Sequence, residues 1–177
     1  LEQLAAETTQ AMLSFPGASA SGAVLIAVAF LPALCEELAF RSVYQPLFVR
    51  STKRLHLGIW IGAAFFSAIH MQFQGFIPRM LIGGGLGYLV VWSGSIWPAV
   101  IGHFVNNAGT ILQAKIYGRE WIESEMQGIT PWEKQDYLVA LGCAVGIGLT
   151  VLAMRKLAPW SQQAQRYLDS LGRAANS

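Results

Sequence analysis

The sequence carries little charge. Only 12% of its 177 residues are Asp, Glu, Lys or Arg, about half the fraction found in an ordinary soluble domain, whereas 54% are hydrophobic. A soluble single domain is therefore the weaker interpretation. The formal net charge of +2 is too small to favour nucleic acid, and no basic patch is interleaved with aromatic residues. We therefore expect no nucleic-acid partner.

Cysteine is scarce as well. The two cysteines, Cys35 and Cys143, each lie inside an apolar segment. This placement argues against a small domain held together by a disulfide framework. Cysteines in such segments are expected to be buried free thiols.

The sequence is rich in long apolar stretches. They separate a few charged clusters, a layout typical of a multi-pass membrane protein. We predict a single all-α domain, a polytopic membrane helix bundle with about five membrane segments. These are expected at residues 22–49, 55–73, 80–92, 96–117 and 137–154. The third is too short to cross a bilayer alone at about 1.5 Å per residue, and the Ser-Gly-Ser stretch after it indicates a re-entrant break. Residues 1–17 have the period of an interfacial amphipathic helix, and residues 155–177 form a polar tail.

The charges outside these segments predict an orientation in the cell membrane. Basic residues gather in the loop from Arg50 to Arg54 and in the tail after Met154, whereas acidic residues gather near the start of the chain and before the last segment. By the positive-inside rule, the basic side is cytoplasmic. Five segments then place Ser177 in the cytoplasm and Leu1 outside. The chain starts without a methionine, which fits a piece of a longer protein.

Away from the segment ends, five Glu, Arg and His side chains fall inside the predicted segments, in the core at residues 22–117: Glu36, Glu37, Arg41, His70 and His103. An uncompensated Glu or Arg at the centre of a span costs about 2.5 to 3.5 kcal/mol. Glu37 and Arg41 lie at i and i+4, so they share a helix face and can form an ion pair. Glu36 points about 100° away and has no partner on its own helix. A purely structural ion pair leaves Glu36 unexplained.

The positions of other polar residues along their helices predict which of them lie near Glu36. Glu36 and His70 each lie 14 to 15 residues from the predicted cytoplasmic end of their segment, or about 21 Å along a helix. His103 and Asn107, at i and i+4, share a face and reach the same level through the re-entrant break. A buried glutamate beside a histidine can activate water, and a second histidine with an asparagine amide can stabilise an oxyanion. Together these are the parts of a peptidase.

Three motifs occur in order along the chain: Glu36-Glu37-x-x-x-Arg41, Phe66-x-x-x-His70 and His103-x-x-x-Asn107. This set resembles that of the CAAX protease and bacteriocin-processing (Abi) family, intramembrane glutamic endopeptidases that include the CAAX prenyl endopeptidase. The resemblance implies cleavage of a membrane-anchored protein or peptide without a cofactor.

The resemblance also implies roles for the motif residues. Glu36 and His70 would activate the water, and His103 and Asn107 would form the oxyanion site. Glu37 with Arg41 would be the supporting pair, and Phe66 would line the site. Ser42 stands where the family often has glycine. Members commonly have more than five spans, which implies helices upstream of this chain or a partner subunit.

Three other functions remain open. The first is a zinc peptidase with Glu36, His70 and His103 as ligands, although the sequence has no HExxH or other close-spaced ligand motif. The second is a non-enzymatic membrane scaffold or immunity protein with the same fold. The third is a proton-coupled transporter, which the lack of an evident inverted repeat disfavours.

Overall fold

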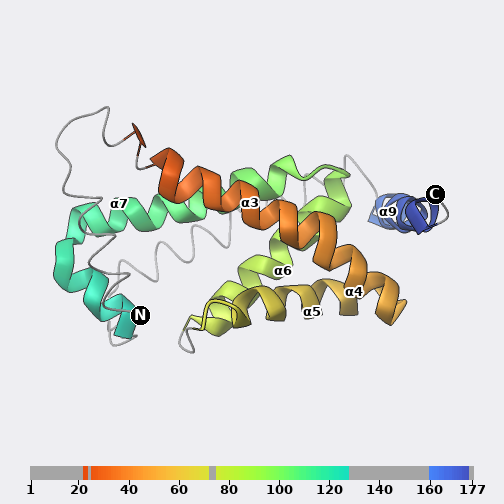
Figure 1. The fold of residues 1–177 in the computed structure, drawn as a ribbon, viewed down its shortest axis with the longest axis horizontal. Helices are drawn as coiled ribbons and strands as arrows, with labels where there is room; N and C mark the ends of the chain where they lie inside the picture. Colours follow the sequence, from red (N-terminus) through yellow and green to blue (C-terminus); the bar gives the residue numbers. More distant parts are fainter. Residues whose placement is uncertain (1–21, 24, 72–74, 128–159, 176–177) are drawn as a thin grey trace.

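The computed structural model describes residues 22–23, 25–71, 75–127 and 160–175, and every regular element in this part is helical (Figure 1). The elements are η1 (Leu25–Phe30), α3 (Leu31–Ala39), η2 (Phe40–Tyr44), α4 (Gln45–Thr52), α5 (Leu55–Ala68), α6 (Phe76–Ser93), α7 (Trp97–Gln127) and α9 (Trp160–Ala175). The all-α prediction is confirmed for these residues. The predicted interfacial helix at residues 1–17 and the predicted last span at 137–154 lie outside the described residues.

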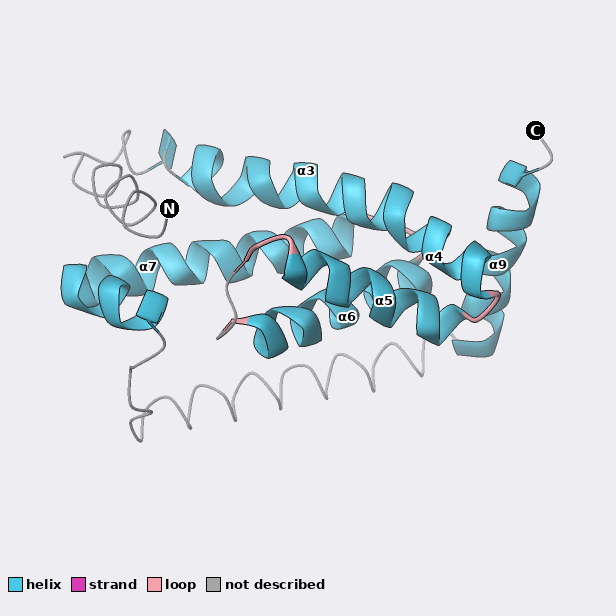
Figure 2. Ribbon diagram, turned by 60° about the horizontal axis from the view of Figure 1, so that its bottom comes forward, coloured by secondary structure: helices cyan, strands magenta, loops and turns pink. Residues whose placement is uncertain are grey.

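The first predicted segment forms one continuous rod from η1 to α4 (Figure 1). Two of its stretches, η1 and η2, have π-helical hydrogen bonding, and each precedes an α-helix with proline in its first two positions. Proline lacks the N–H that an uninterrupted α-helix would use. The rod ends at Lys53, whose φ of 54° is left-handed, and α5 then returns alongside α4 (Figure 2).

Glycine lets α4 and α5 approach closely. A Cβ added to Gly58 would lie 2.5 Å from Cα of Val49, so no larger residue fits at this crossing without moving backbone. Small residues at contact points are how membrane helices pack without a hydrophobic driving force between them. A glycine also allows close packing between α6 and α5, since a Cβ on Gly84 would lie 2.8 Å from the Trp60 ring.

The prediction of a short third segment is wrong, because α6 begins at Phe76 rather than near Met80. Pro78 lies in its first turn, where a missing N–H costs nothing. Within the described ranges, α6 is the one helix long and apolar enough to cross a membrane, and α5 is a shorter apolar helix. A bundle of five spans is therefore not established. Gly94, with φ of 67°, ends α6, and the chain bends into α7, which continues past the predicted end at residue 117.

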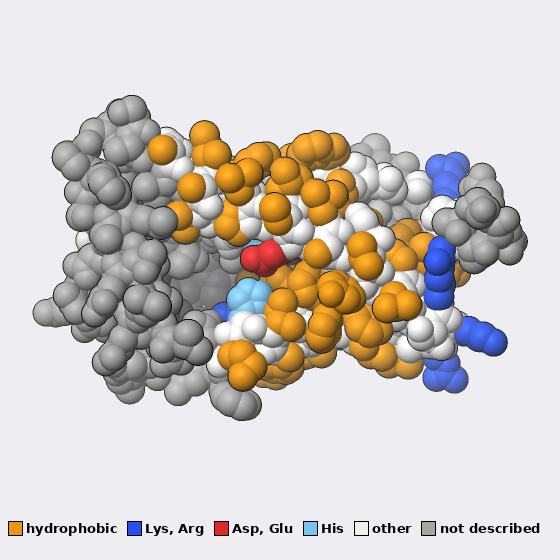
Figure 3. Space-filling model, in the orientation of Figure 1, with side chains coloured by type: hydrophobic (Ala, Val, Ile, Leu, Met, Phe, Trp, Pro, Cys, Tyr) orange, Lys and Arg blue, Asp and Glu red, His pale blue; other side chains and the backbone are white. Residues whose placement is uncertain are grey.

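Apolar side chains cover much of the face shown in Figure 3, while basic side chains gather at one end of it. Val43, Ile101 and Val105 are each more than half exposed, as expected for side chains that face lipid rather than water. Cys35 is a free thiol, as predicted, but it is exposed rather than buried. It lies on the outer side of α3, away from the face that carries Glu37.

Candidate active site

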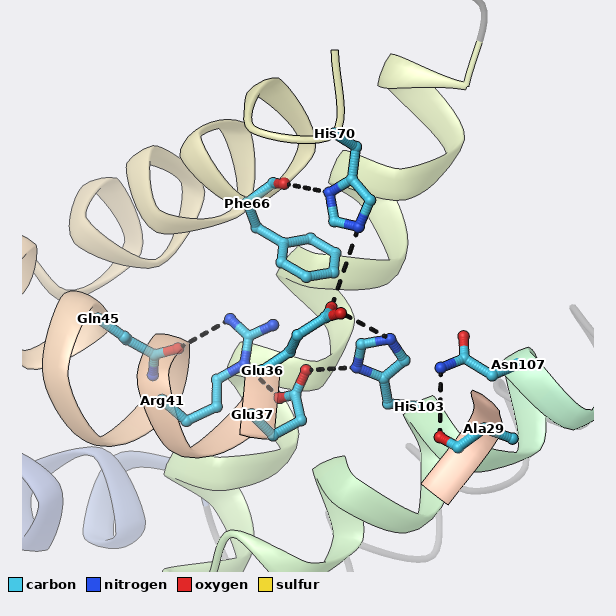
Figure 4. A network of polar contacts seen from close by, with 9 residues as sticks. All are labelled: Ala29, Glu36, Glu37, Arg41, Gln45, Phe66, His70, His103 and Asn107. Carbon is cyan, nitrogen blue, oxygen red and sulfur yellow. Dashed lines mark hydrogen bonds and ion pairs between the residues drawn. The ribbon is translucent and has the colours of Figure 1, made fainter. Parts of the chain in front are cut away.

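Glu37 lies at the centre of a polar cluster between α3, η2 and α7 (Figure 4). Its side chain is fully buried. Oε2 accepts a hydrogen bond from Nε of Arg41 at 2.6 Å, and Oε1 lies 2.9 Å from Nδ1 of His103. Both contacts are short, as charge-assisted hydrogen bonds are. The structure thus joins Glu37 and Arg41, as their spacing predicts, and adds His103 to the pair.

Glu36 lies beside Glu37 and points toward both histidines (Figure 4). Its Oε2 lies 3.9 Å from Nε2 of His70 and 3.8 Å from Nε2 of His103. This oxygen is enclosed and has no hydrogen-bond partner in the described part of the chain, although the side chain as a whole is 32% exposed. Both distances exceed a hydrogen bond. Glu36 is therefore near both imidazoles but bonded to neither.

His70 does not lie within a helix as predicted, because α5 ends at Ala68 and His70 occupies the turn after it. The apolar pattern of the sequence continues to Phe73 and therefore does not indicate that the helix ends at Ala68. In the turn, Nδ1 of His70 lies 2.8 Å from the carbonyl oxygen of Phe66. A carbonyl can only accept, so Nδ1 carries the hydrogen, and in the neutral ring Nε2 has the free lone pair. That lone pair faces Glu36.

Phe66 forms an apolar wall beside the histidines. Its side chain is buried, and its ring meets those of His70 and His103 edge to face, with centroids 4.9 and 5.7 Å apart. Asn107 lies one turn beyond His103 on α7, but its amide nitrogen donates to the carbonyl of Ala29 in η1 at 3.4 Å. The predicted residues therefore gather in one place, with the Asn107 amide engaged by the backbone of η1 (Figure 4).

Sequence reasoning missed two polar residues around this cluster. Gln45 is fully buried and contacts Arg41; the stripe of Glu37, Arg41 and Gln45 at i, i+4 and i+8 was the available signal. Arg79 is the second. Its guanidinium lies against Gly75, where a Cβ would approach it to 2.9 Å, and its charge interacts with that of Glu36. Its position in an apolar stretch was the signal.

The described part of the chain is helical, carries many exposed apolar side chains and brings Glu and His side chains together, which is typical of a membrane enzyme. A family model described as type II CAAX prenyl endopeptidase Rce1-like matches residues 18–109, just over half of the chain. The chain belongs to this family and is a CAAX-type membrane endopeptidase. All seven predicted site residues lie in the matched region. Searches of curated proteins and of solved structures returned no match.

No group of three His, Cys, Asp or Glu side chains within the described ranges is arranged to hold a metal ion. Glu36, His70 and His103 are nevertheless the residue types that zinc accepts. The zinc alternative therefore needs a direct test.

Proposed function

We propose that the protein is a metal-independent glutamic endopeptidase that hydrolyses a peptide bond in a membrane-anchored protein or peptide. The observation that carries this proposal is the approach of two imidazole nitrogens to one oxygen of Glu36, at 3.9 and 3.8 Å. Gaps of this size are suited to a water molecule that bonds to both sides. Glu36 and His70 would hold and activate that water.

The first chemical step is attack of the water oxygen on the substrate carbonyl carbon. Glu36 takes a proton from the water as the new carbon–oxygen bond forms, and the lone pair on Nε2 of His70 can accept a hydrogen bond or the proton in turn. The carbonyl oxygen becomes an oxyanion. When the intermediate collapses, the carbon–nitrogen bond breaks and the stored proton passes to the leaving amine. Water is thereby divided between a new carboxylate and a new amine.

His103 and Asn107 are assigned to the oxyanion. Glu37 accepts from Nδ1 of His103, so a proton on Nε2 would make this imidazole a cation that donates toward the reacting centre, with the Glu37 carboxylate stabilising its charge. Arg41 shares that carboxylate. Asn107 would contribute its second amide N–H, the first being used by Ala29.

The membrane setting fits this reaction. The exposed apolar side chains and the basic end (Figure 3) support a multi-pass protein with its C-terminus on the cytoplasmic side. Glu36 is partly exposed, so a substrate anchored in the same bilayer could reach it. Further helices or a partner subunit would complete the wall of the site.

The decisive experiment compares wild-type protein in detergent with Glu36→Gln on a panel of quenched fluorescent peptides, prenylated and unmodified. We expect cleavage by the wild type and a loss of at least a hundredfold in Glu36→Gln, because the amide cannot take a proton. Asp169→Asn makes the same chemical change on the exposed face of α9 and should leave the rate unchanged. Equal rates for Glu36→Gln and the wild type would contradict the mechanism.

A zinc peptidase is the second candidate, because Glu36 lies within 4 Å of an imidazole nitrogen of each histidine and all three are residue types that zinc accepts, although no described group is arranged to hold a metal ion. A chelator separates the two mechanisms. The metal-free mechanism predicts an unchanged rate after chelation and less than stoichiometric zinc by elemental analysis. Loss of activity on chelation with recovery on zinc addition would establish the alternative. Folded wild-type protein that cleaves no peptide in the panel would support a scaffold role instead.

A further inference from the structure

The C-terminal helix α9 reaches the buried cluster through one side chain. The Tyr167 hydroxyl accepts a hydrogen bond from Nε2 of Gln45 at 3.4 Å, and the same nitrogen donates to the carbonyl of Gly87 at 3.3 Å. Oε1 of Gln45 accepts from Nη1 of Arg41 at 3.4 Å. Tyr167 therefore lies at the far end of a polar chain that continues through Arg41 to Glu37.

The Gln45 amide is held in one orientation. It is fully buried, and a Cβ on Gly87 would lie 2.7 Å from its Oε1, so the α6 backbone packs directly against it. Both amide N–H groups have acceptors only while the Tyr167 hydroxyl is present. Burial raises the pKa of this hydroxyl above its usual value, so it stays neutral at physiological pH. A buried N–H without an acceptor is unfavourable, so loss of the hydroxyl would leave one N–H of the amide unpaired and loosen its orientation.

Besides the Tyr167 hydroxyl, two contacts hold α9 at the end of the bundle, where Figure 2 shows it beside α4. The Tyr167 ring packs on the core cluster between α6 and the start of α7, and Nη2 of Arg50 donates to the carbonyl of Leu171 at 2.7 Å. Beside Tyr167 lies a cavity of about 460 Å³, lined by the α6–α7 turn and by polar side chains of α9. Together with the hydroxyl contact to Gln45, these two contacts attach α9 to α4 and α6.

We propose that α9 is a positioning element for the protease site. Tyr167, through Gln45, holds the guanidinium of Arg41 and thereby the Glu37 carboxylate that orients His103. This inference rests on the proposed function, because the group finally positioned is the imidazole that faces Glu36. Tyr167 and Gln45 are positioning residues and touch no reacting atom. A small displacement of the His103 imidazole would matter, because misplacing a reacting group by about 1 Å can lower the rate about a hundredfold.

Tyr167→Phe tests the inference because it removes one hydroxyl and keeps the ring. We expect kcat to fall about fivefold or more, as for loss of a buried hydrogen bond, with KM unchanged and little change in the melting temperature. The matched control is Tyr88→Phe, which removes a hydroxyl that lies 2.9 Å from His56 at an exposed position. Equal kcat for Tyr167→Phe, Tyr88→Phe and the wild type would overturn the proposal.

A second pair of variants covers the case in which Tyr167→Phe does not fold. Arg50→Gln removes the exposed contact to Leu171 and should also lower kcat at constant KM, whereas Lys53→Gln, an exposed cation nearby, should not. Full activity in Arg50→Gln would count against a role for α9. The proposed function fails separately, through an active Glu36→Gln, and the two failures are therefore distinguishable.

Discussion

At the scale of single residues, two adjacent glutamates have opposite surroundings. Glu37 is fully buried and bonded on both oxygens, whereas Glu36 is partly exposed and one of its oxygens has no hydrogen-bond partner in the described part. A carboxylate that is fully engaged holds other groups in place, while one that is not can accept a proton from water. The contrast supports the proposed division, in which Glu37 has a supporting role and Glu36 a catalytic one.

This contrast predicts different effects on stability. Glu37→Gln leaves the buried Arg41 guanidinium without a counter-charge and should destabilise the fold by about 3–5 kcal/mol, as breaking a buried ion pair does. Glu36→Gln should change stability by less than about 1 kcal/mol, because its carboxylate makes no short contact. Denaturation of both variants in the same detergent, followed by tryptophan fluorescence, measures the difference. Equal stability of the two would show that the Glu37–Arg41 pair is not a structural support.

At the scale of helices, the close approach of helix backbones determines where the site residues lie. The α4–α5 crossing lies at Gly58, and in the same rod α3 packs on α7 and brings both glutamates to it. His70 then reaches Glu36 from the end of α5, and His103 reaches it from α7. The geometry of the cluster therefore depends on contacts that involve none of its own side chains.

A pair of glycine substitutions tests this dependence. Gly58→Ala would bring Cβ to 2.5 Å from the Val49 backbone, so the helices must separate, and we expect a loss of about 1–3 kcal/mol, as for overpacked cores, together with reduced activity. Gly85→Ala is the control: nothing lies within 4 Å of its Cβ, and alanine is the better helix former by about 1 kcal/mol. Thermal unfolding of both variants provides the measurement. A destabilised Gly85→Ala would mean that helix propensity does not govern that position here.

At the scale of the whole molecule, the apolar surface and the basic end predict how the protein lies in the bilayer. Exposed basic residues of α4 and α9 share one end (Figure 3), while Met71, 81% exposed, follows the opposite end of α5. We expect Lys53→Cys and Asp169→Cys, in a background without Cys35 and Cys143, to react with a membrane-impermeant maleimide from the cytoplasmic side of sealed vesicles. Met71→Cys should not react from that side. Labelling of Lys53→Cys and Asp169→Cys from opposite sides would contradict the orientation.

By itself, the sequence determined the helical class, the membrane setting and the identities of the clustered residues, because apolar runs and i, i+4 spacings are local properties. The pairing of Glu37 with Arg41 follows from one helix alone. Only the tertiary structure decided that His103 bonds Glu37 rather than Glu36, that His70 sits in a turn, and that α9 contacts Gln45. These contacts join residues 66 and 122 positions apart or depend on where a helix ends, and no local pattern encodes how separate helices pack.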